Sequence, residues 1–195
     1  MNMTRGLRNN NPLNIRHSAD RWQGARTEQT DASFVQFQSM AYGYRAGWKL
    51  LESYWKHFNT ARQPFTVEAV VRRWAPPSEN DTTAYIRTVL RLTSLGGNER
   101  LPRPFKGYML GKLARLLGAM TVVECGIPIH QVDYDAIWQG YDLAFPGKRL
   151  THRGNVRSTQ PLILQPVPIP EPLEKTFHNW DEYWDWSPAV HWGEG

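Results

Sequence analysis

Five segments between Tyr42 and Ala144 carry apolar residues at three- and four-residue steps, and this spacing constrains the fold more than any other feature of the chain. Residues with this spacing share one face of an α-helix. Prolines, glycines and capping side chains separate the segments, as expected at helix boundaries. The expected helices span residues 42–58, 67–74, 82–92, 106–124 and 133–144. The pattern predicts a mainly α-helical domain.

The region before the first helix predicts a small β element. An asparagine-rich turn at residues 9–14 precedes it, and apolar and polar residues alternate in Phe34-Val35-Gln36-Phe37. Alternation of this kind is typical of a strand with one buried face. We expect a β-hairpin within residues 15–37, so the predicted fold class is α+β, mainly α with a small hairpin.

The regular pattern ends after Phe145-Pro146-Gly147, which divides the chain into three parts. Residues 1–148 form the predicted domain, and residues 149–175 form a basic and proline-rich linker. Residues 176–195 form an acidic tail that holds four of the nine tryptophans. A segment rich in proline is expected to be extended. The tail is therefore an appendage of the domain.

The net charge of +5 hides an uneven distribution. From Glu171 onward, six acids accompany one base, which leaves 22 bases and 12 acids in the first 170 residues. A body this basic favours an anionic partner such as nucleic acid or a cell envelope, although a solvated basic surface is the simpler interpretation. No helix-turn-helix, RNA-recognition or zinc-finger motif is present, so the sequence does not favour nucleic acid. The acidic tail would either screen the body or dock onto another protein.

Several classes of protein are disfavoured by what the sequence lacks. No apolar run approaches the ~20 residues of a membrane span, and residues 1–16 have no apolar signal-peptide core. Cys125 is the only cysteine, so no internal disulfide is expected. The six histidines show no metal-ligand spacing, and no phosphate-binding loop is present. We therefore expect no metal and no cofactor.

Glu124 is the candidate for acid–base chemistry. It ends the most apolar of the expected helices, just before Gly126-Ile127-Pro128. The negative end of the helix dipole and the apolar neighbours Met120 and Val123 both disfavour the ionised carboxylate and raise its pKa. A carboxyl group that is neutral near pH 7 can protonate a glycosidic oxygen. The alternative is a glutamate at a helix end that points to water.

Three further acids are candidate second carboxylates or ligands of substrate amides. Glu79 lies between Pro76-Pro77 and a helix start, where an acid is also a routine cap. Asp31 and Glu28 lie on the expected hairpin, where the default is an exposed loop acid. Cys125 with His57 or His130 would make a Cys/His peptidase of peptide cross-links, although a lone cysteine at a helix end is usually a small buried residue.

Two strings carry a family resemblance. RGLRNNNPLNIR at residues 5–16 and WAPPSENDT at residues 74–82 resemble a family of phage-associated proteins often labelled structural protein P-five. The resemblance covers about residues 5–128, with Leu13 in place of a family glycine and Cys125 in place of a family asparagine. It implies a protein of a phage or prophage, and its label implies a virion structural or assembly role.

A weaker similarity concerns the order of motifs. The asparagine-rich string, Trp22-Gln23-Gly24, Thr27-Glu28 and the pair Phe34 and Phe37 precede a long helix, an order similar to that of the glucosaminidase branch of the lysozyme superfamily. It implies a lysozyme-like fold. Glu124 would fill the place of the catalytic glutamate if the topology is circularly permuted, which is an inference from the residues.

The leading hypothesis is a muramidase or lytic transglycosylase that cleaves peptidoglycan glycan strands. Glu124 would donate the proton, and Glu79 or Asp31 would act as the second carboxylate. Substrate contacts are expected from aromatic and polar side chains: Asn11, Asn14, Trp22, Glu28, Trp74, Asn80 and Tyr85. Large aromatics at helical spacing are also typical of a core.

The alternatives differ in class and in partner. The chain would be a non-enzymatic virion protein, the Cys/His peptidase above, or an antibacterial effector with the same glycan chemistry. The tail's partner would accordingly be a virion component, an export machinery or an immunity protein. We expect the chain to be made in the bacterial cytoplasm, and either to act in the periplasm and cell wall or to be carried in a virion.

Overall fold

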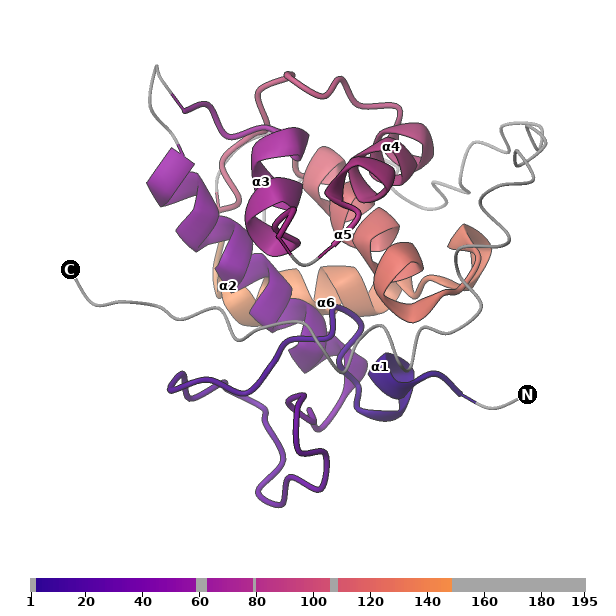
Figure 1. The fold of residues 1–195 in the computed structure, drawn as a ribbon. Coiled ribbons are helices and arrows are strands. Elements are labelled where there is room, and N and C mark those ends of the chain that lie inside the picture. The colour runs from indigo at the N-terminus through magenta and orange to yellow at the C-terminus, as the bar shows by residue number, and fades with distance from the viewer. Residues whose placement is uncertain (1–2, 59–62, 79, 106–108, 149–195) are drawn as a thin grey trace.

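The computed structural model describes residues 3–58, 63–78, 80–105 and 109–148 (Figure 1). The chain forms seven helical elements in this part: α1 (Arg5–Arg8), α2 (Met40–Phe58), α3 (Val67–Trp74), α4 (Thr82–Thr93), α5 (Leu110–Cys125), the 3-10 helix η1 (Ile129–Gln131) and α6 (Tyr134–Ala144). The mainly helical part of the predicted fold class is confirmed. The predicted linker and tail lie outside the described residues.

Capping side chains set where three of the helices begin. The hydroxyl of Thr66 accepts from the backbone N–H of Ala69, and the Asp81 carboxylate accepts from that of Ala84. Asp133 caps α6 in the same way through Ala136. At the other end, Ser94 and Gly126 take the left-handed conformation that ends α4 and α5. These caps hold helix ends whose backbone groups have no partner within the helix.

The predicted β-hairpin is wrong. In residues 15–39 the structure has two isolated antiparallel bridges, Arg16 with Phe34 and Ala25 with Phe37, and no strand. A few backbone bonds cross this segment, among them Val35 N–H to the Ile15 carbonyl and Arg26 N–H to the Gln36 carbonyl. Side chains supply others: the Asn11 amide donates to the carbonyls of Ile15 and Val35. The lysozyme-like topology stays a prediction.

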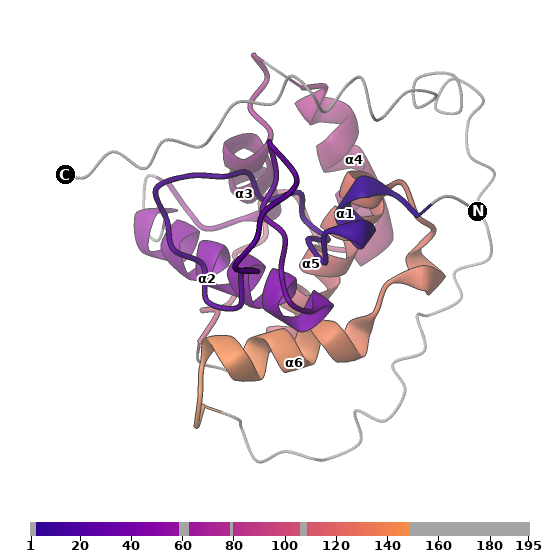
Figure 2. The same ribbon diagram turned by 90° about the horizontal axis from the view of Figure 1, so that it is seen from below.

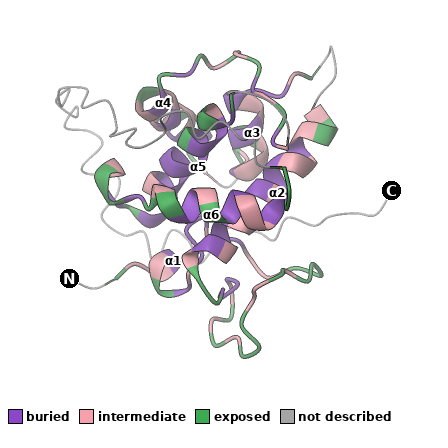
Figure 3. Cartoon of the chain, turned by 180° about the vertical axis from the view of Figure 1, so that it is seen from behind, coloured by how far each residue is buried: buried purple, intermediate pink, exposed green. Residues whose placement is uncertain are grey.

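Helix α2 packs closely against α6, which crosses it (Figures 1 and 2). The fully buried Trp48 of α2 donates from its indole N–H to the carbonyl of Ile137 at 2.9 Å. A Cβ on Gly140 would lie 2.8 Å from the Ala41 carbonyl oxygen, so glycine allows the crossing. Helix α5 is buried along most of its length (Figure 3).

The asparagine-rich loop packs against α2 and α5. A Cβ on Gly43 would lie 2.2 Å from the Asn10 carbonyl oxygen, and one on Gly47 would lie 2.4 Å from a methyl of Leu13. Leu13 is buried, and the left-handed residues of the loop are Asn10 (φ 51°) and Asn14 (φ 46°). Asparagine tolerates this conformation better than most residues.

In the described part of the chain, no helix combines the length and hydropathy needed to cross a membrane.

Candidate functional site

Glu124 lies inside the domain, one residue before the end of α5 (Leu110–Cys125). Its side chain is 4% exposed, and Gly126 ends the helix with φ 61°. A carboxylate at this depth needs hydrogen-bond donors, because burial of an unpaired charge is costly.

Three side chains supply those donors. The Trp74 indole N–H and the Tyr85 hydroxyl both donate to Oε1 of Glu124, at 2.7 Å and 2.9 Å. The Asn14 amide donates to Oε2 at 3.2 Å and to the Glu124 backbone oxygen at 2.8 Å. We call Glu124 and these three donors the Glu124 cluster. It joins four of the residues that the sequence singled out, from the end of α3, from α4, from α5 and from the N-terminal loop.

The proton affinity of Glu124 follows from burial. Burial raises the pKa of its carboxyl group from 4.5 to about 7, against the lowering effect of the Trp74, Tyr85 and Asn14 hydrogen bonds. The positive charge of Arg16 lowers the pKa further. The neutral and ionised forms are therefore both populated near neutral pH. The sequence pointed to a raised pKa but did not single out Arg16, whose only signal is its place two residues after Asn14.

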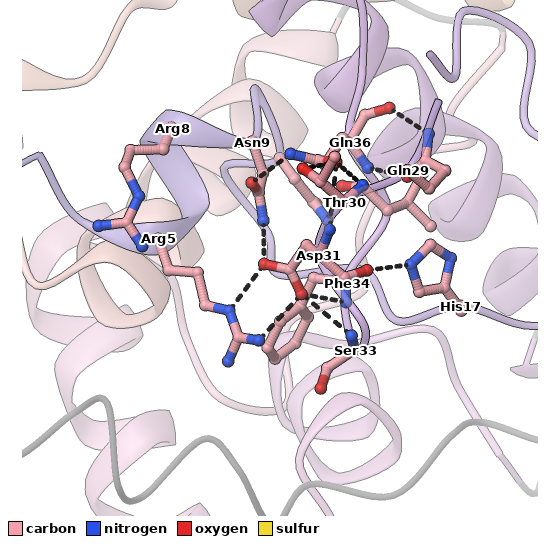
Figure 4. A network of polar contacts seen from close by, with 12 residues as sticks. Arg5, Arg8, Asn9, His17, Gln29, Thr30, Asp31, Ser33, Phe34 and Gln36 are labelled. Carbon is pink, nitrogen blue, oxygen red and sulfur yellow. Dashed lines mark hydrogen bonds and ion pairs between the residues drawn. The ribbon is translucent and has the colours of Figure 1, made fainter. Parts of the chain in front are cut away.

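Asp31 lies in a different network, which ties α1 to the loop that follows it (Figure 4). Its carboxylate accepts two hydrogen bonds from Arg5, at 2.8 Å and 2.9 Å, and one from Asn9 at 2.7 Å. The backbone N–H groups of Ser33 and Phe34 each add one at 3.0 Å. These donors outweigh partial burial and hold the pKa of Asp31 well below its usual range. Asp31 is thus an ionised structural carboxylate, which does not favour a role as a proton carrier.

No recorded contact within the described residues joins the other predicted substrate residues to Glu124. Asn11 is buried and its amide donates to backbone carbonyls of the loop, whereas Glu28 is exposed. Trp22 is partly buried against the core. The Asn80 amide donates to the Pro76 carbonyl at 3.4 Å. Glu79 lies outside the described residues, so its predicted role stays a prediction.

The thiol of Cys125 is placed as a core group. Cys125 is 3% exposed, and its Sγ–H donates to the Pro12 carbonyl at 3.4 Å. Burial raises the pKa of this thiol to about 12, so it is protonated at neutral pH. A nucleophilic cysteine needs the thiolate form. This geometry argues against the Cys/His peptidase.

Within the described ranges, no three His, Cys, Asp or Glu side chains gather as metal ligands would.

No family model matches the chain. Comparison with curated proteins gives a specific relationship. The chain is 33% identical over 146 residues to Protein P5 of Pseudoalteromonas phage PM2, an alignment that spans 73% of this chain and 83% of that protein. The chain therefore belongs to the P5 family of phage proteins.

Proposed function

We propose that the chain is a structural component of a phage particle. The observation that carries this proposal is the match to a phage protein over 83% of that protein's length. The fold adds two features that suit a lasting assembly part. A dense helical core buries Trp48, Tyr44 and Tyr54 almost completely. The buried Glu124 and the partly buried Asp31 tie distant segments together.

Particles made from the genome that encodes the chain test this role. After purification on a density gradient and a high-salt wash, mass spectrometry is expected to find the chain at a fixed ratio to the major capsid protein across independent preparations. An early, non-particle phage protein from the same lysate serves as the control and should stay in the soluble fraction. A chain that follows the control would contradict the proposal.

A second candidate is glycan cleavage by the same protein, and the Glu124 cluster favours it. With the indole of Trp74 and the hydroxyl of Tyr85 on Oε1, the proton of the neutral form resides on Oε2. Transfer of that proton to a glycosidic oxygen leaves a carboxylate that Trp74, Tyr85 and Asn14 stabilise with charge-assisted hydrogen bonds. A pKa near 7 suits a general acid.

This second function places a demand on the structure. Glu124 is 4% exposed, so a glycan reaches its Oε2 only when the neighbouring surface opens. The other carboxylate must also lie within ~5–9.5 Å of it. Asp31 is committed to Arg5 and Asn9. Glu79 is therefore the proposed partner, and the product would be a reducing sugar or an anhydro sugar.

Digestion of purified peptidoglycan sacculi separates the two functions. If the chain is an enzyme, mass spectrometry of the soluble muropeptides should show new sugar ends, and Glu124→Gln should lower the rate by about 10²–10⁴-fold, the usual contribution of a general acid. Glu68→Gln, which changes a surface glutamate, is the control and should keep the rate. New peptide termini would instead indicate peptidase activity. If the wild-type chain releases no product, only the structural role remains.

A further inference from the structure

A chain of aromatic rings with cations over them runs across the ends of α2 and α6. Trp55 contacts Phe105 edge to face with ring centroids 5.3 Å apart, and Phe105 lies 6.3 Å from Phe145. Each ring has its own cation: Arg103 at 4.9 Å from the Trp55 centroid, Lys148 at 5.7 Å from that of Phe105, and Lys49 at 5.1 Å from that of Phe145. We call these six residues the ring–cation face.

The outer part of the face is accessible and positively charged. Arg103 and Lys148 are exposed, and Trp55 and Phe105 are half-buried, whereas Phe145 is buried beneath them. Lys49 forms an ion pair with Glu52, whereas no carboxylate within the described segments is recorded as an ion-pair partner of Arg103 or Lys148. A cation held over a ring keeps N–H groups that point away from it and can bind an anion. The face therefore offers aromatic surface and cations side by side.

The acidic tail has the complementary composition. Residues 180–186 read Trp-Asp-Glu-Tyr-Trp-Asp-Trp, which places three carboxylates among four rings. From Glu171 onward, the segment carries six acids and one base. Opposite charges and aromatic contacts of this kind favour association of the two surfaces.

The chain length permits the two to meet. The described part ends at Lys148, which is itself a member of the face, and 22 residues separate it from Glu171. A proline-rich segment of this length can extend to about 70 Å, at ~3.1 Å per residue. A domain of this size has a radius of gyration of about 15 Å. A tether of this reach holds the tail at an effective concentration on the order of millimolar.

We propose that residues 171–195 dock onto the ring–cation face of their own domain. The carboxylates of Asp181, Glu182 and Asp185 pair with its cations, and the tail's tryptophans pack against Trp55 and Phe105. The tail thereby covers the aromatic surface of the domain in the free protein.

Zero-length carbodiimide cross-linking of the full chain tests this docking, because it joins amines only to carboxylates in direct contact. The expected products link Lys148 or Lys49 to the three tail acids within the monomer band. Arg103→Glu should lower their yield about fivefold, the scale of one or two exposed ion pairs. Arginine does not form an amide with an activated carboxylate, so this substitution removes no reactive amine from the face. Arg87→Glu, an exposed charge reversal on α4, is the matched control and should leave the yield unchanged.

Three results would overturn the proposal. The first is coupling of the tail acids to Lys112 in the same yield as to Lys148 and Lys49. The second is links that occur only between chains, in a dimer band that depends on protein concentration. An equal fall in yield for Arg87→Glu would show that only net charge matters. Far-ultraviolet circular dichroism checks that each variant is folded, and Arg103→Gln provides a milder change, with a smaller fall in yield expected.

Discussion

The difference in unfolding free energy between the wild-type chain and Glu124→Gln is expected to change by about 3 kcal/mol between about pH 4 and pH 8. The folded state raises the pKa of Glu124 from 4.5 to about 7, so it binds the proton more tightly than the unfolded chain does. The stabilisation from this proton is complete below about pH 4.5 and is lost as the pH rises through about 7. Glutamine resembles the neutral acid and does not titrate. The wild-type chain should therefore lose stability relative to Glu124→Gln as the pH rises.

Urea unfolding of both chains at several pH values measures this change, and the subtraction removes the titrations that they share. Glu68→Gln is the control, because Glu68 is a surface residue paired with Arg72. Its difference from the wild-type chain should stay within about 0.5 kcal/mol. A constant difference for Glu124→Gln across the pH range would show that folding does not shift the pKa of Glu124. The carboxyl group would then be ionised at neutral pH, which would also remove it as a general acid.

Gly43→Ala is expected to destabilise the domain by about 3 kcal/mol, whereas Gly111→Ala should stabilise it by about 0.5–1 kcal/mol. Both glycines lie in helices. A methyl group on Gly43 of α2 would lie 2.2 Å from the Asn10 carbonyl oxygen and 2.6 Å from Pro12, so the asparagine-rich loop must move. A methyl group on Gly111 of α5 meets nothing within 4 Å, and alanine is the better helix former.

Thermal and urea unfolding of the two variants measure these opposite effects. For a domain of about 150 residues, 1 kcal/mol corresponds to roughly 2–4 °C in Tm. The pair shares one chemical change, so helix propensity alone predicts the same sign for both. Stabilisation by Gly43→Ala would mean that the loop does not pack on α2 as described.

The helices could be predicted from the sequence because their signals are local. The expected spans 67–74, 82–92 and 133–144 agree with α3, α4 and α6 to within one residue at either end. Thr66, Asp81 and Asp133 cap the backbone within a few positions of themselves, so their effect is visible in the sequence. The short helices α1 and η1 were not predicted, because one turn of helix leaves no apolar repeat.

The N-terminal segment could not be predicted in the same way. Its alternating residues suggested strands, but side chains take up backbone groups there: the Asn11 amide binds the Val35 carbonyl, and the Gln36 amide oxygen accepts from the Thr30 N–H. The role of Asp31 also depends on Arg5, which is 26 residues away. Bonds of this range depend on how the whole segment packs, and a periodic pattern does not record them.

The candidate site was accessible to sequence reasoning in part. The helix-end position and apolar neighbours of Glu124 indicated a raised pKa. Trp74 and Asn14 lie in the strings that carry the family resemblance, and both were predicted as substrate contacts. That Trp74, Tyr85 and Asn14 meet on one carboxylate follows from the packing of α3, α4 and the loop against α5, which the sequence does not show. Of the two interpretations of Cys125, a small buried residue or a peptidase nucleophile, the structure agrees with the first.

The bond between Asn14 and Glu124 joins positions 110 residues apart, and this matters during synthesis. While the ribosome is still adding α5, the loop that carries Asn14 can pack only against α2, and the surface that α5 supplies is missing. Translation at ~5–20 residues per second needs on the order of ten seconds to reach α5. During that time the apolar side chains of Leu13, Phe34 and Phe37 are incompletely buried in the nascent chain. The packing of the N-terminal loop is therefore completed late in synthesis. A chaperone that binds exposed apolar side chains would act mainly before that point.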